Sequence, residues 1–223
     1  MQEARSGFKL NVPSMDAHVF PPGTTVLLTG RPGAGKSVFA EQFLLEGLQR
    51  GQNGIYVVTD TSGESLKRKV ESTPAVNAKL ELVNLFLEKP RLINDISISV
   101  HQAISRYNGQ QVRLAFDSLS TLGMLFNPEV LPPWVLDQRA RFTKHRSNVL
   151  ALMVYDLGIH SPQITRSLQV LSDVVLEMKL QESEDEPKRL FRVFSSRDTS
   201  HSAKWYQFII DNSGLRFEEH IGT

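Results

Sequence analysis

Eight consecutive residues have the types and the spacing of a phosphate-binding loop. Gly30–Ser37 reads GRPGAGKS and matches the pattern G-x-x-x-x-G-K-[ST]. Glycines let backbone N–H groups converge on phosphate oxygens without a side-chain clash. Lys36 can place a positive charge on the β- and γ-phosphates, and the Ser37 hydroxyl can ligate Mg²⁺. The pattern predicts binding of a nucleoside triphosphate, with ATP and Mg²⁺ as the expected pair.

The segments on either side of this loop have the character that such a site requires. An apolar strand is expected over Val26–Thr29, and an amphipathic helix over Lys36–Arg50. The helix would direct the positive end of its dipole at the phosphates. The residues expected to contact the nucleotide are Gly30, Pro32, Gly33, Ala34, Gly35, Lys36, Ser37 and Val38.

A carboxylate for the metal ion is available at the end of another apolar run. Asp117 follows Val112–Phe116, and the carboxyl ends of parallel strands meet at one edge of a sheet. We therefore predict Ser37 and Asp117 as the Mg²⁺ ligands. The alternative is that Asp117 caps the N-terminus of a following helix, and it could fill both roles.

The elements around these residues alternate between strand and helix, which predicts an α/β fold with a mostly parallel central sheet flanked by helices. The last third of the chain changes character and predicts antiparallel strands at one edge of the sheet. We expect one domain over residues 1–223, with a surface loop at Phe126–Trp134. The predicted strands are Val26–Thr29, Ile55–Thr59, Val112–Phe116, Val149–Tyr155, Val174–Met178, Leu190–Ser195, Trp205–Ile210 and Leu215–Phe217; the predicted helices are Lys36–Arg50, Leu92–Tyr107 and Trp134–His145.

Composition excludes several classes of site. The chain has no cysteine, which rules out disulfides, iron–sulfur clusters and thiolate zinc sites. The net charge is +1, so a nucleic-acid partner would need a local basic patch. Met1–Val12 lacks the apolar core of a signal peptide, and the longest apolar run, Val149–Tyr155, is too short to span a bilayer. A cytoplasmic protein with no membrane span is expected.

Four segments together resemble a branch of the P-loop proteins, the RecA-like ATPases, and within it the KaiC-type domains. The first contains the phosphate loop, the second resembles the family's strand ending in two glutamates, the third its Walker B strand, and the fourth a late strand and loop. Their order and spacing extend over most of the chain. The segments are Thr29–Glu46 (TGRPGAGKSVFAEQFLLE), Gly54–Leu66 (GIYVVTDTSGESL), Leu114–Leu122 (LAFDSLSTL) and Phe191–Ser202 (FRVFSSRDTSHS).

The resemblance implies a RecA-type fold that assembles as a ring or filament with ATP between subunits. It assigns the water-activating position to Asp60 and a basic finger, directed at the neighbour's γ-phosphate, to Arg197. The sequence departs from the family at three positions. Asp60 is one methylene shorter than the usual glutamate, Thr61 replaces the second glutamate, and Ser195 replaces a lysine two residues before the finger. We therefore expect at most a weak ATPase.

Three functions of different kinds are compatible with these residues. The favoured one is an ATP-binding regulatory or assembly-controlling homo-oligomer, a role that is compatible with a protein partner. The alternative is an active RecA-like ATPase that acts on DNA in recombination or repair, and a P-loop kinase is a weaker third. DNA contacts would come from the basic residues of the Trp134–His145 helix and from Leu157–Leu168, whose one fixed cation is Arg166. Nucleic acid is therefore the less favoured partner.

Overall fold

One mixed β-sheet organises the part of the chain that the computed structural model describes, namely residues 7–59, 63–71, 78–85, 90–144, 148–182, 186–197 and 199–218. Its strands lie in the order β3-β2-β4-β5-β1-β6-β7-β8-β9. The first six are parallel, whereas β7, β8 and β9 are antiparallel. The bounds are β1 Thr25–Gly30, β2 Asn53–Val58, β3 Leu80–Asn84, β4 Val112–Asp117, β5 Val149–Asp156, β6 Val174–Gln181, β7 Lys188–Ser196, β8 Tyr206–Asp211 and β9 Gly214–Phe217.

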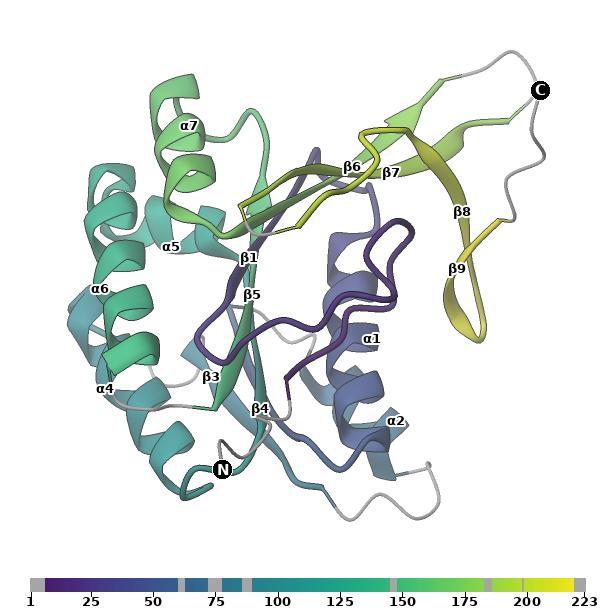
Figure 1. The fold of residues 1–223 in the computed structure, drawn as a ribbon. Coiled ribbons are helices and arrows are strands. Elements are labelled where there is room, and N and C mark those ends of the chain that lie inside the picture. Colours follow the sequence, from purple (N-terminus) through teal and green to yellow (C-terminus); the bar gives the residue numbers. More distant parts are fainter. Residues whose placement is uncertain are drawn as a thin grey trace.

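Helices cover both faces of the parallel part of the sheet (Figure 1). The described helices are α1 Lys36–Gln49 and α2 Gly63–Glu71 on one face, and α4 Ile93–Ser105, α5 Leu119–Phe126, α6 Leu131–Lys144 and α7 Pro162–Leu171 on the other, with a 3-10 turn, η1, at Pro128–Val130. The α/β class, the mostly parallel sheet and the antiparallel C-terminal edge are those that the sequence predicts. Within the described residues, no helix has the length and apolar character to cross a membrane.

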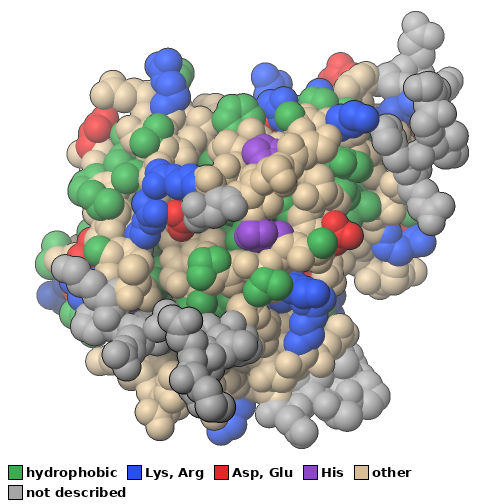
Figure 2. All heavy atoms as spheres, viewed as in Figure 1, with side chains coloured by type: hydrophobic (Ala, Val, Ile, Leu, Met, Phe, Trp, Pro, Cys, Tyr) green, Lys and Arg blue, Asp and Glu red, His purple; other side chains and the backbone are tan. Residues whose placement is uncertain are grey.

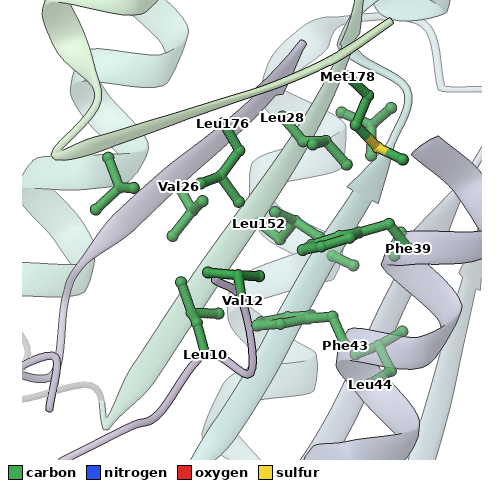
Figure 3. Packing of buried hydrophobic residues seen from close by; sticks show 14 of the residues in the cluster. Leu10, Val12, Val26, Leu28, Phe39, Phe43, Leu44, Leu152, Leu176 and Met178 are labelled. Carbon is green, nitrogen blue, oxygen red and sulfur yellow. The ribbon is translucent and has the colours of Figure 1, made fainter. Parts of the chain in front are cut away.

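The buried strands divide their side chains between two cores. Val26 and Leu28 of β1 belong to the core beneath α1 and α2, whereas Leu27 belongs to the core beneath α4 to α7. This division follows from the alternation of side chains along a strand that is buried on both faces. In Figure 3 the rings of Phe39 and Phe43 lie between α1 and the strands. Each fully buried side chain of this size contributes about 1.5–3 kcal/mol to folding, so α1 is firmly held against β1.

The surface loop predicted at Phe126–Trp134 and the Leu157–Leu168 segment are both partly helical. Within Phe126–Trp134, α5 ends at Phe126, η1 follows, and α6 begins at Leu131. The prolines Pro132 and Pro133 lie in the first turn of α6, where the missing N–H groups are not needed by the helix.

Leu157–Leu168 likewise contains most of α7. Ser161 caps this helix by accepting a hydrogen bond from the Ile164 N–H, and Pro162 opens it. A loop at Leu157–Leu168 is therefore wrong, since a proline is well suited to the first position of a helix.

Candidate functional site

The phosphate loop joins the end of β1 to the start of α1, and its glycines are required by the local backbone. Gly33 and Gly35 have φ values of 81° and 100°, which side chains rarely adopt. A Cβ on Gly35 would lie 2.7 Å from the Cδ1 atom of Ile210 in β8, and one on Gly30 would clash with the Met178 carbonyl oxygen of β6. The loop is therefore shaped by strands that come from much later in the sequence.

Lys36 is the buried cation of this site. The residue is 5% exposed, and its Nζ donates a hydrogen bond of 2.8 Å to the Arg31 carbonyl oxygen. The same Nζ lies 2.8 Å from Asp156 Oδ1. A buried ammonium needs such partners because desolvation without them is costly. Lys36 is thus held at the loop, where a phosphate would meet it.

Ser37 and Val38, the next two residues, form the first turn of α1. Ser37 is exposed and Val38 is half-buried. Ser37 therefore has access to a ligand at the loop, whereas Val38 also packs against the core beneath α1. Pro32 and Gly33 are exposed at the crest of the loop, and Ala34 is fully buried beneath it.

Asp117 ends β4 at the same edge of the sheet, but β5 lies between β4 and β1. The hydroxyl of the fully buried Tyr56 donates a 2.9 Å hydrogen bond to Asp117 Oδ2, and the Thr59 N–H donates to the Asp117 carbonyl oxygen at 3.1 Å. The helix-capping alternative for Asp117 is wrong, because Ser118 is the N-cap of α5 and accepts from the Thr121 N–H. Asp117 is therefore held by Tyr56 and does not cap α5.

The groups at this edge of the sheet are of the kinds that would bind a phosphate with its magnesium ion. The carboxyl ends of β1 and β5 bring together a glycine-shaped loop, the ammonium of Lys36 and the carboxylate of Asp156, and Asp117 ends β4, the next strand of the sheet. The described residues contain no group of three or more His, Cys, Asp or Glu side chains that could hold a metal ion. A cation at this edge would therefore need phosphate oxygens and water among its ligands, which is the usual coordination of Mg²⁺ in nucleotide sites.

Of the two predicted catalytic positions, one lies outside the described residues and the other, Arg197, lies away from this edge. Asp60 and its neighbour Thr61 lie outside the described residues. Arg197 follows β7, which runs antiparallel to β6, with Ser196 opposite Val174 at the amino end of β6. The Arg197 guanidinium donates to the Val170 carbonyl oxygen at the end of α7. Arg197 therefore lies at the opposite end of the sheet from its own phosphate loop.

Sequence reasoning missed Asp156, which is the partner of Lys36. It ends β5 directly opposite Gly30, and its N–H donates a 2.7 Å hydrogen bond to Ser120 Oγ. A signal was available, because Asp156 follows the apolar run Val149–Tyr155 just as Asp117 follows Val112–Phe116. Burial raises the pKa of the adjacent Tyr155 phenol, with a smaller contribution from Asp156, so the Tyr155 phenol stays neutral at physiological pH.

Comparisons with known proteins agree with this geometry. The sequence model of a family described as "ATPase: KaiC" matches residues 8–221. A UPF0273 protein of Pyrococcus furiosus is 28% identical over 93% of this chain and 92% of its own length. A UPF0273 protein of Thermotoga maritima is 25% identical over 93% of both chains. The circadian clock protein KaiC3 of Synechocystis is 40% identical over 50 residues, which are 22% of this chain and 10% of that protein.

A solved structure has the same fold. The KaiC-like protein of Pyrococcus horikoshii superposes with a TM-score of 0.76 at 23% identity, covering 96% of this chain and 99% of that one. The family match extends over the phosphate loop, the strand that ends in Asp117 and the late antiparallel strands. The chain therefore belongs to the KaiC-type family of RecA-like P-loop ATPases.

Proposed function

We propose that this protein binds ATP with Mg²⁺ and uses the occupancy of that site to control its assembly with further copies of itself, with slow or negligible hydrolysis. The observation that carries the proposal is the distance between the phosphate loop and Arg197, the predicted basic finger. The phosphate loop and Lys36 lie at the carboxyl end of β1, whereas Arg197 lies at the amino end of β6. An arginine placed in this way can reach a γ-phosphate only on another copy.

Slow hydrolysis follows from the residues that would turn ATP over. A general base must lie within hydrogen-bond reach of the water it activates, and a misplacement of roughly 1 Å can cost about 10²-fold in rate. Asp60 is shorter than glutamate, and Thr61 and Ser195 supply neither a second carboxylate nor a second cation. Ser195 is half-buried in β7 opposite Val175. Binding is therefore better supported than turnover.

Measuring the molar mass of the purified protein by light scattering, with and without Mg²⁺-ATP, tests the proposal. We expect ATP to change the mass of the wild-type protein and to leave that of Lys36→Ala unchanged. A mass that does not respond to ATP in the wild-type protein would contradict the assembly part. Bound nucleotide, measured separately by calorimetry, distinguishes a failure of binding from a failure of coupling.

Turnover is tested by restoring the family residues. The double variant Asp60→Glu with Ser195→Lys should hydrolyse ATP faster than the wild-type protein, because it recovers a full-length base and a second cation. Phosphate release under saturating Mg²⁺-ATP gives the rate. An unchanged rate would show that these positions do not form the hydrolytic site.

Binding to DNA has less support. On the face shown in Figure 2, Lys and Arg side chains lie in several separate groups with apolar and neutral surface between them. Two arginines of the basic helix α6 are already paired, Arg139 with Asp173 and Arg141 with Asp137. DNA affinity that falls with salt requires several phosphate contacts. Single-stranded and duplex DNA should therefore neither bind at low salt nor raise ATP turnover.

A further inference from the structure

The carboxylate of Asp156 and a bound phosphate need the same ammonium group. Asp156 Oδ1 lies 2.8 Å from Lys36 Nζ, the atom that in phosphate loops contacts the β- and γ-phosphates. We propose that Asp156 competes with the nucleotide for Lys36 and so makes nucleotide binding depend on Mg²⁺. This inference rests on the proposed ATP-binding function and adds to it a residue that sets the cation requirement of the site.

Asp156 is fixed in place by its backbone. In the β1–β5 pairing it lies opposite Gly30, the first residue of the loop, and the next N–H, that of Leu157, donates to the Gly30 carbonyl oxygen at 3.0 Å. On its other side, the Asp156 N–H donates to Ser120 Oγ at 2.7 Å. The Asp156 backbone therefore cannot withdraw from the loop when a ligand binds, and only the side chain can move.

Lys36 already has two oxygen partners. One N–H of its ammonium donates to the Arg31 carbonyl oxygen, and the same nitrogen forms the ion pair with Asp156 Oδ1. Its side chain is 4% exposed, whereas that of Asp156 is 21% exposed. A phosphate that takes the ammonium leaves the Asp156 carboxylate beside it without that partner. Because Asp156 is close to water, it tolerates this loss of a partner better than a fully buried carboxylate would.

The electrostatic consequence is a requirement for a second cation. Free ATP brings about four negative charges to an edge of the sheet that already holds Asp156 and Asp117. One ammonium cannot neutralise them, whereas Mg²⁺ bound to the phosphates removes two of the charges. A neutral residue at position 156 would release Lys36 and lower the repulsion, so the benefit should be greatest when Mg²⁺ is absent.

Calorimetric titration of ATP, once with Mg²⁺ and once with EDTA, tests this on the full chain. Asp156→Asn should bind ATP about tenfold more tightly than the wild-type protein in EDTA, and by a smaller factor with Mg²⁺. Asp156→Glu keeps the charge and should retain most of the Mg²⁺ dependence. Asp137→Asn removes the same charge from an exposed ion pair on α6 and should leave both affinities unchanged.

The possible results distinguish a failure of the competition by Asp156 from a failure of ATP binding. A wild-type protein that binds no ATP under either condition contradicts the proposed function itself. If the wild-type protein binds but Asp156→Asn has the same ratio of affinities with and without Mg²⁺, the competition is refuted and ATP binding stands. Weaker binding by Asp156→Asn with Mg²⁺ would make Asp156 a support for the metal and also refutes it. If Asp156→Asn does not fold by circular dichroism, Asp156→Ser is titrated against the same criteria.

Discussion

Two buried cations lie at opposite ends of the sheet, and their surroundings differ. Arg113, near the amino end of β4, is 0% exposed; its guanidinium donates to the Gln52 side chain at 2.7 Å and to the carbonyl oxygens of Phe43 and Lys9 at 2.8 Å each. It also lies 4.8 Å from the centre of the Phe43 ring. Lys36, at the carboxyl end of β1, has as partners one carbonyl oxygen and one carboxylate whose side chain is 21% exposed.

The difference indicates which cation is structural and which is available to a ligand. Most partners of Arg113 are neutral and are fixed by the chain, so nothing that enters from solvent can replace them. Burial lowers the pKa of Arg113 to about 10, which still leaves it charged at neutral pH. The charged partner of Lys36 stands at a strand end near solvent, and a phosphate can take its place. A buried cation with one exchangeable anionic partner is therefore a better indication of a binding site than burial alone.

The largest expected effect is on stability at the Arg113 end. Arg113→Ala would remove the guanidinium from two carbonyl oxygens, from the Gln52 side-chain oxygen and from the nearby Glu46, and should lower the free energy of unfolding by about 3–5 kcal/mol. Urea unfolding measures this. The matched control is Arg141→Ala, whose exposed ion pair on α6 should change stability by no more than about 0.5 kcal/mol. Equal effects for the two variants would contradict the structural role of Arg113.

The next effect is on ligand binding at the other end. Lys36→Met should weaken ATP binding by roughly 100-fold, or about 2.7 kcal/mol, because it removes the buried charge at the loop. Its cost in stability should be smaller than that of Arg113→Ala, since the remaining Asp156 carboxylate can be solvated. A loss of unfolding free energy as large as that of Arg113→Ala would contradict the assignment of Lys36 to ligand binding and of Arg113 to structure.

A smaller effect is expected from the shape of the loop itself. Gly35→Ala combines a positive φ with a Cβ 2.7 Å from Ile210, and we expect a loss of about 1–2 kcal/mol in stability together with weaker ATP binding. Gly51→Ala is the control, because Gly51 has a φ of 78° and no atom within 4 Å of an added Cβ. The difference in unfolding free energy between the two variants measures the effect of the contact with Ile210 of β8. Equal losses for the two variants would show that Ile210 does not constrain the loop.

The smallest expected effect is the pH dependence of the stability contributed by Glu46, which lies near Arg113. Burial raises the pKa of Glu46 above 4.5, while Arg113 opposes that shift. Between 4.5 and the raised pKa the folded protein therefore binds more protons than the unfolded chain, so the stability contributed by Glu46 falls as pH rises through this window. Glu46→Gln should thus match the wild-type protein at acidic pH and become the more stable of the two above the window. A constant difference in unfolding free energy across pH would contradict this.

Much of the parallel sheet could be predicted because its strands are apolar on both faces. Predicted and observed strands agree within about two residues for β1, β4 and β5. By contrast, β3 was missed because Leu80–Asn84 is a short, half-buried edge strand that mixes polar and apolar residues. The helix starts at Leu131 and Pro162 were missed because proline is compatible both with a loop and with a first helical turn.

The site was only partly accessible from the sequence. The phosphate loop is contiguous, so its residues could be recognised together. Its partners are brought together by strand order, and no local pattern shows that β5 lies between β1 and β4 or that Asp156 meets Lys36. The position of Arg197 at the far end depends on the reversal of direction between β6 and β7. The phosphate-binding motif is thus local, whereas the arrangement of strands and side chains around it is not.

The place of β1 in the sheet also determines when the site can form during synthesis. Its two neighbours are β5 and β6, which begin at Val149 and Val174, more than half the chain further on. Until these strands leave the ribosome, both edges of β1 lack their hydrogen-bond partners and the loop has no rigid frame. Ile210, which lies against Gly35, arrives later still. Nucleotide retention by a nascent chain would therefore show that β5 and β6 have been made and paired with β1, and fragments that end before β6 should not bind.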